Sequence, residues 1–170
     1  MAPKQTIHIR IAGDDLIFSA AHFITLDAEN CERLHGHDYH VAAEVYGPLG
    51  EDHYVVDFVA VRDALRGILA EMDHRVLLPT GHPTIGVSAG PEQVPEQEVT
   101  VTFCERRWVF PRGDCLLMPI PSTTSELLAR HVGDRLLDEL QSRCGSRPVR
   151  LRIEIRESCG FSAVCELRDE

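Results

Sequence analysis

The amino-acid sequence predicts an α+β fold with a mostly antiparallel sheet and two helices. Two observations lead to this prediction. Several short segments alternate between apolar and polar residues, whereas only two segments carry apolar residues at helical spacing. The strands also follow one another as hairpins would, which favours antiparallel pairing over the parallel sheet of a regularly alternating β–α chain.

Alternation of residue type identifies the strands. In the first, Ile7, Ile9 and Ile11 share one face while polar side chains occupy the other. The segments expected to be strands are 6–12, 37–46, 99–103, 107–110, 149–155 and 161–167. The third and fourth of these are close enough to form a hairpin across residues 104–106.

Both expected helices begin at a capping signal. Asp57 is a suitable N-cap for a helix over 58–72. Thr123 and Glu126 have the spacing of a capping box, which would open the second helix. That helix presents one apolar stripe, formed by Leu128, Val132, Leu136 and Leu140.

The length of 170 residues is suited to a single domain spanning 1–170. Residues 79–98 are rich in glycine and proline and are expected to form a loop. Together with the expected hairpin, they make 79–119 a predicted insertion into the domain.

Composition excludes several classes of protein. With 17 Lys and Arg against 27 Asp and Glu, the net charge of −10 argues against a nucleic-acid partner. No apolar run approaches the roughly 20 residues of a membrane span, and the N-terminus lacks a signal-peptide core. A cytoplasmic location is therefore expected, in which the six cysteines, none in a C-x-x-C pair, would be mostly plain buried thiols, Cys159 and Cys165 among them.

A pair of histidines is the strongest chemical signal. His35 and His37 lie two apart in an extended segment, so their imidazoles share a face that continues into the apolar residues of the strand. Buried imidazoles need partners, and a metal ion would satisfy both. His22, in another apolar segment, is a candidate third ligand, and three histidines with an open fourth position are typical of catalytic zinc. By themselves these histidines are equally compatible with ordinary core or surface positions.

The order of several short motifs resembles a known family. Phe18-Ser19-Ala20-Ala21-His22 is followed by Cys31-x-x-x-His35-Gly36-His37, by Val56-Asp57-Phe58 and by Met72-Asp73-His74. Thr124-Ser125-Glu126 and Arg156-Glu157-Ser158 continue the match, which leaves out only about 79–119. In this arrangement the chain resembles the 6-pyruvoyl- and 6-carboxy-tetrahydropterin synthases.

The resemblance implies a tunnelling fold (T-fold), in which an antiparallel sheet carries two helices on one face. Its protomers assemble into an oligomeric barrel, commonly a homohexamer built from two trimers with active sites at subunit interfaces. The resemblance also implies roles for individual residues. His22, His35 and His37 would hold Zn²⁺, Cys31 would be the catalytic base, and Asp73 and His74 its relay partners. Glu157 would anchor the pterin and act as a further relay residue, and the other substrate contacts would be Thr124, Ser125 and Glu32.

The implied activity is zinc-dependent conversion of 7,8-dihydroneopterin triphosphate to a 6-substituted tetrahydropterin. The three residues between Cys31 and His35 resemble the short spacing of the 6-carboxy enzymes of queuosine and deazapurine biosynthesis. Formation of the 6-pyruvoyl product is an alternative. Glu32 also fits the pattern E-x-x-H-G-H of relatives that form 6-hydroxymethyl-dihydropterin for folate synthesis. A non-catalytic pterin-binding protein is a further alternative, whereas hydrolase motifs such as H-E-x-x-H are absent.

Overall fold

The computed structural model describes residues 7–89, 98–145, 147–158 and 160–168. Cys159, expected to be a core thiol, lies outside these ranges. None of the helices in the described ranges combines the length and the apolar character that crossing a membrane requires.

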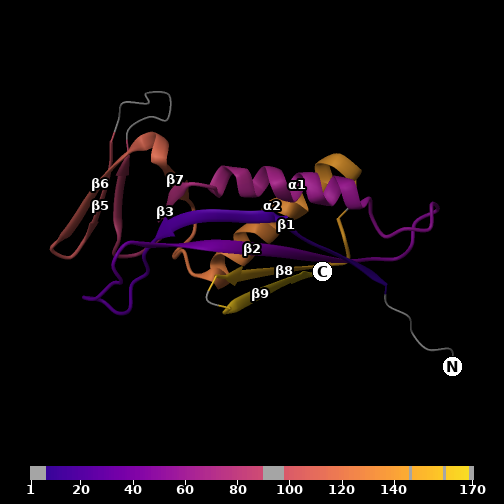
Figure 1. Cartoon of the computed structure of the whole chain (residues 1–170), viewed down its shortest axis with the longest axis horizontal. Coiled ribbons are helices and arrows are strands. Elements are labelled where there is room, and N and C mark those ends of the chain that lie inside the picture. The colour runs from indigo at the N-terminus through magenta and orange to yellow at the C-terminus, as the bar shows by residue number, and fades with distance from the viewer. Residues whose placement is uncertain (1–6, 90–97, 146, 159, 169–170) are drawn as a thin grey trace.

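A six-stranded sheet forms the main layer of the molecule, with the order β7-β3-β1-β2-β8-β9 (Figure 1). Its strands are β1 (His8–His22), β2 (His35–Tyr46), β3 (Arg75–Pro79), β7 (Cys115–Met118), β8 (Arg150–Glu157) and β9 (Ser162–Arg168). The pairs β1–β2, β2–β8 and β8–β9 are antiparallel, as predicted. The pairs β1–β3 and β3–β7 are parallel.

The first strand is twice as long as expected. The register between β1 and β2 shifts between Ala12 and Ile17, so residues 13–16 form an irregularity within one continuous strand. The acidic and glycine residues there interrupt the alternation, and the sequence pattern stops at 12 for that reason. Because β1 continues past the irregularity, it delivers His22 to the end of the sheet.

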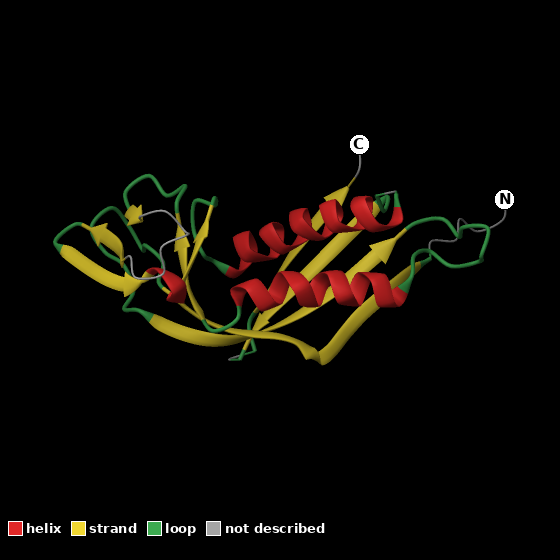
Figure 2. Cartoon of the chain, turned by 90° about the horizontal axis from the view of Figure 1, so that it is seen from above, coloured by secondary structure: helices red, strands yellow, loops and turns green. Residues whose placement is uncertain are grey.

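Helices α1 (Phe58–Met72) and α2 (Ser125–Cys144) lie on the same face of this sheet (Figure 2). The side chain of Asp57 accepts a hydrogen bond from the backbone N–H of Val59, which confirms the predicted N-cap. The predicted apolar stripe of α2 is buried against the sheet, with Leu128, Val132, Leu136 and Leu140 at most 1% exposed. One hydrophobic core therefore lies between the two helices and the sheet.

The predicted capping box of α2 is wrong. Thr124, not Thr123, is the N-cap, and its side chain makes no capping hydrogen bond. Thr123 is fully buried, and its hydroxyl lies 3.3 Å from Nδ1 of His22. Thr123, whose hydroxyl could cap the helix, therefore contacts His22 instead.

A smaller sheet stands at one end of the molecule (Figure 1). It consists of β4 (Gly86–Ala89), β5 (Glu98–Phe103) and β6 (Arg106–Pro111), followed by the short 3-10 helix η1 (Arg112–Asp114). The β5–β6 hairpin was predicted, although Arg106 belongs to the strand rather than to the turn. Its apolar residues form a second core together with Phe23 and Leu78.

Strands β3, β4 and β7 were not predicted. They are only four or five residues long, and two of them read as short apolar runs without alternation, Val76-Leu77-Leu78 and Leu116-Leu117-Met118. Such runs give no periodic signal. Only their pairing with β1 and with each other makes them strands.

Candidate metal and catalytic site

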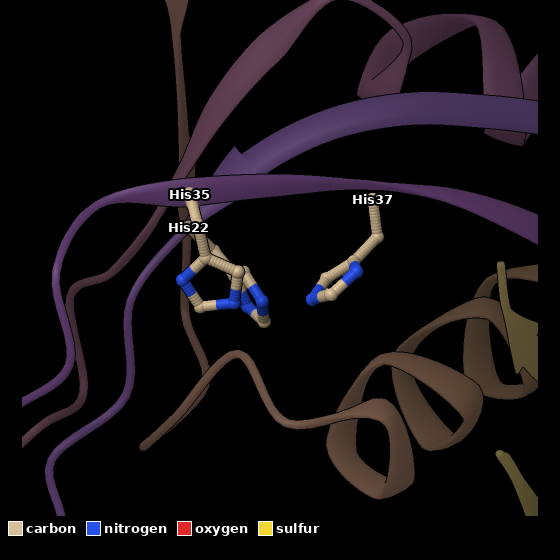
Figure 3. Close-up of side chains that lie close together, drawn as sticks. All are labelled: His22, His35 and His37. Atoms are coloured by element: carbon tan, nitrogen blue, oxygen red, sulfur yellow. The ribbon is translucent and has the colours of Figure 1, made fainter. Parts of the chain in front are cut away.

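Three histidines meet where β1 ends and β2 begins (Figure 3). His22 is the cross-strand partner of His35, and Ala20 is the partner of His37. The antiparallel register therefore puts the three imidazoles on one side of the strand pair. One ligand nitrogen from each ring lies within 4.8 Å of the other two.

Backbone carbonyl groups orient two of the imidazoles. Nδ1 of His22 lies 2.9 Å from the carbonyl oxygen of Thr123, and Nδ1 of His35 lies 2.8 Å from that of Arg33. A carbonyl can only accept, so each Nδ1 is the protonated donor. This tautomer leaves Nε2 of both rings with a lone pair, the state in which a histidine binds a metal.

The buried His22 is held neutral. Burial lowers its pKa, and the neighbouring imidazoles of His35 and His37 contribute in the same direction. Burial also raises the pKa of Tyr39, so its hydroxyl keeps its proton; it lies 3.2 Å from Nε2 of His22 and can donate to that nitrogen only while no metal is bound there. A neutral imidazole is the protonation state that a metal ligand requires.

The donor set fits a metal ion. Three imidazoles converge, two of them with fixed tautomers, and three protein ligands leave a tetrahedral metal one position for a further ligand. The structure therefore places His22, His35 and His37 where they could hold a metal, as the sequence predicted.

A cavity of about 330 Å³ opens beside the histidines. Its lining comes from the end of β1, the start of β2, the start of α2, the end of β8 and the start of β9, and includes Thr124, Ser125 and Glu157. The hydroxyl of Ser125 donates to Oε1 of Glu157, whose Oε2 lies 3.9 Å from Nε2 of His37. A half-buried carboxylate thus faces the histidine cluster across the cavity.

Glu32 and Cys31 take different environments. Glu32 lines the cavity, and its Oε2 lies 3.8 Å from Nε2 of His35. Cys31 packs against the second core, and its Sγ accepts a hydrogen bond of 2.8 Å from Arg106. Of the two neighbouring candidate bases, the carboxylate is the one that faces the cavity.

Asp73 and His74 form a pair on another part of the chain. Their side chains lie 2.8 Å apart, which the left-handed backbone of His74, with φ of 57°, makes possible for adjacent residues. The backbone N–H of Ser19 donates to Asp73 and is the main cause of the lowered pKa of that carboxyl. Among the described residues, no hydrogen bond or ion pair joins this pair to Cys31.

His74 does not line the cavity that His22 and His35 border. It lines a second cavity of about 520 Å³, together with Arg75, Asp114 and Asp38, and His37 borders both cavities. Within one chain, the predicted relay pair and the predicted base therefore do not form one site.

Sequence reasoning missed three residues that shape the site: Thr123, Tyr39 and Arg106. Thr123 and Arg106 contact His22 and Cys31 across 101 and 75 positions of sequence, respectively. Tyr39 was assigned correctly to the core face of β2, and only the approach of β1 brings its hydroxyl to His22. No local pattern carries this information.

Residues 15–168 match the family model described as 6-pyruvoyl tetrahydropterin synthase. A relative from Methanocaldococcus jannaschii, named putative 6-carboxy-5,6,7,8-tetrahydropterin synthase, is 30% identical over 149 residues. The aligned part covers 87% of this chain and 88% of that protein.

Solved structures share the fold. The 6-pyruvoyl tetrahydropterin synthase of Plasmodium falciparum has a TM-score of 0.84 at 23% identity, and the comparison covers 98% of this chain and all of the other. A Plasmodium vivax 6-pyruvoyltetrahydropterin synthase, described as the alanine variant of a catalytic glutamate, has a TM-score of 0.85 at 22% identity with the same coverage. The α+β tunnelling fold predicted from the sequence is thereby confirmed. The chain belongs to the 6-pyruvoyl tetrahydropterin synthase family and is an enzyme of the tetrahydropterin synthase type.

Proposed function

We propose that this chain converts 7,8-dihydroneopterin triphosphate to 6-carboxy-5,6,7,8-tetrahydropterin with the help of zinc, as in the queuosine and deazapurine pathways. The observation that carries the proposal is the cavity in which the three-histidine cluster faces the carboxylate of Glu157. The name of the M. jannaschii relative and the C-x-x-x-H-G-H spacing support the 6-carboxy product over its alternatives.

The metal is proposed to be zinc, held by Nε2 of His22, His35 and His37. Neutral imidazoles suit zinc, and a three-histidine set is typical of its catalytic sites. When bound, zinc would supply Lewis-acid polarisation of the hydroxyl groups on the substrate's side chain.

Glu157 is proposed to orient the pterin. A pterin presents an amino group and a ring N–H side by side, and a carboxylate can accept both in parallel. Ser125 donates to Oε1 and thereby fixes the carboxylate at the cavity wall, where Thr124 also lies. The ring would then be held with its side chain toward the histidines.

Proton removal is proposed to fall to Cys31, assisted by His74 and Asp73. Because these residues lie apart within one chain, the proposal requires a second subunit to bring them together. A homohexamer formed as a dimer of trimers, with sites between subunits, satisfies this requirement. Asp73 remains a carboxylate because of its lowered pKa, so it can hold His74 in one orientation.

A cytoplasmic location is part of the proposal. The described cysteines, at positions 31, 104, 115, 144 and 165, are all free thiols. Free thiols agree with a reducing compartment.

Product analysis tests this function. Purified, zinc-loaded protein is incubated with 7,8-dihydroneopterin triphosphate, and the pterins are separated and identified by mass. We expect 6-carboxy-tetrahydropterin from the wild type, and a loss of most turnover in Cys31→Ala with zinc content preserved. A wild type that forms no 6-carboxy product would contradict the proposal.

The position of Glu32 favours a second candidate function, formation of 6-hydroxymethyl-dihydropterin. Glu32 lines the cavity, whereas Cys31 packs against the second core. The P. vivax structure, described as a variant of a catalytic glutamate, adds support from a protein of the same fold. A carboxylate at this place would take the substrate proton in place of the thiol.

Comparing variants distinguishes the two functions. If Glu32 acts as base, Glu32→Gln loses a hydroxymethyl product that Cys31→Ala retains. Absence of that product from the wild type and from both variants would rule out the second function and leave the first one standing.

A further inference from the structure

Arg106, on strand β6 of the small sheet, reaches the segment that carries both candidate bases. Its Nη1 lies 2.8 Å from Sγ of Cys31, 3.1 Å from the carbonyl oxygen of Cys31 and 3.0 Å from that of Glu32. One guanidinium group thus contacts the side chain of the first residue and the backbone of both. All three contacts come from this one nitrogen, which holds the sulfur and the two carbonyl oxygens around a single point and thereby restrains the segment.

Arg106 is itself held in place. Its guanidinium lies over the ring of Trp108, 4.7 Å from the centroid, and Trp108 stacks on Phe23 at 4.6 Å. Phe23 directly follows the histidine His22 and is buried. A continuous series of contacts therefore connects the β5–β6 hairpin to the histidine cluster.

The orientation of the segment decides which side chain faces the cavity. The backbone N–H of Glu32 donates to the carbonyl of Ile24 across 2.9 Å, and Cys31 forms an isolated bridge with Thr25. Neighbouring residues of an extended segment point to opposite sides. With Arg106 on the sulfur of Cys31, Glu32 is left toward the cavity.

We propose that Arg106 is a positioning residue that fixes how Cys31 and Glu32 are presented to the reacting atoms. The inference rests on the proposed function only in naming these two residues as the candidate bases. It also gives the small sheet a function: the hairpin carries a guanidinium to the catalytic segment.

Hydrogen–deuterium exchange tests the positioning without any need for turnover. Arg106→Met keeps an unbranched, flexible stem but removes the guanidinium. Arg107→Met is the matched control, because Arg107 is the exposed neighbour of Arg106 on the same strand. In zinc-loaded full-length protein, we expect peptides covering residues 24–34 to exchange at least five-fold faster in Arg106→Met than in wild type or Arg107→Met. Equal exchange in the three proteins would overturn the proposal.

Steady-state kinetics test the catalytic consequence. A group that positions the base acts on the chemical step, so Arg106→Met is expected to lower kcat at least ten-fold while KM stays within two-fold. Arg106→Lys, which keeps the charge, should recover part of the loss, and it carries both comparisons should Arg106→Met fail to fold. An unchanged kcat, or an effect seen only as an increase in KM, would overturn the role. A wild type without activity would instead disprove the proposed function, and the exchange comparison would still decide whether Arg106 holds the segment.

Discussion

At the scale of single residues, main-chain groups determine how the histidines are presented. The Nδ1–H groups of His22 and His35 each donate to a backbone carbonyl, of Thr123 and Arg33 respectively. Such partners fix ring rotation and tautomer without a dedicated carboxylate. The proposed metal site therefore depends on the path of the chain at residues 33 and 123 as much as on the ligands themselves.

Removal of one ligand should release the metal. His35→Ala is expected to reduce bound zinc from about one ion per chain to less than about a tenth of that, since three protein ligands are the usual complement of a catalytic zinc site. Metal analysis after dialysis measures this. His40→Ala is the control, because His40 lies on β2 but outside the cluster. Full zinc occupancy in His35→Ala would reject the assignment of this ligand.

The anchoring role of Glu157 predicts a selective loss of pterin binding. In Glu157→Gln one acceptor becomes a donor, and losing a charge-assisted pair costs about 1.5–3 kcal/mol, or roughly ten-fold to a hundred-fold in affinity. Titration with a pterin ligand measures the affinity, and zinc content should be unchanged. Glu154→Gln on the same strand is the control, since Glu154 pairs with Arg10 outside the cavity. Equal pterin affinity in Glu157→Gln and wild type would exclude the role.

At the scale of elements, the hydroxyl residues at the start of α2 contact site residues instead of capping the helix. Thr123 contacts His22, Ser125 donates to Glu157, and the N-cap Thr124 makes no side-chain capping bond. Local rules for helix starts fail at functional positions because the same hydroxyl groups are needed elsewhere. The helix is stabilised instead by its buried apolar stripe.

The same helix carries a histidine that makes stability depend on pH. Burial lowers the pKa of His131 below its unfolded value of about 6.5. The unfolded chain then binds a proton more readily than the folded one, so stability is lost as the pH falls below about 6.5 and is unaffected above it. Urea unfolding should show a larger loss of stability from pH 7.5 to 5.5 in wild type than in His131→Gln. Identical losses would show that His131 makes no such contribution.

At the scale of the whole molecule, one chain does not bring together all the residues that we propose as catalytic. His22 and His35 border one cavity, His74 borders another, and only His37 of these residues borders both. The sheet also ends, within the described residues, at β7 and β9, which have a neighbour on one side only. Strand edges of this kind are suited to pairing with further chains.

Assembly between subunits predicts complementation of two inactive variants. Cys31→Ala and His74→Ala should each lose activity alone. If their sites combine residues of neighbouring subunits, random co-assembly restores about a quarter of the sites, because each site needs two intact contributions. Activity after unfolding and refolding the two variants together measures this. Recovery at the level of either variant alone would place both residues in the same subunit's site.

The sequence by itself determined the elements that have a period and the residues that lie close along the chain. Alternation identified β2 and β8, helical spacing identified α1, and the two-residue spacing of His35 and His37 put them on one face. The Asp73–His74 pair was implied by the family resemblance, and the left-handed backbone of His74 allows their side chains to meet. Each of these depends on local geometry, which a sequence pattern encodes directly.

Only the tertiary structure decided which distant residues meet. The pairing of β3 with β7, the contact of Thr123 with His22 and the contact of Arg106 with Cys31 join positions about 40 to 100 residues apart. Nothing periodic marks these residues, because each contact depends on how two separately predictable elements pack. The orientation of Cys31 and Glu32 was decided in the same way. The sequence does not show which of two consecutive residues faces the cavity, whereas in the structure Arg106 of β6 contacts Cys31 and Glu32 lines the cavity.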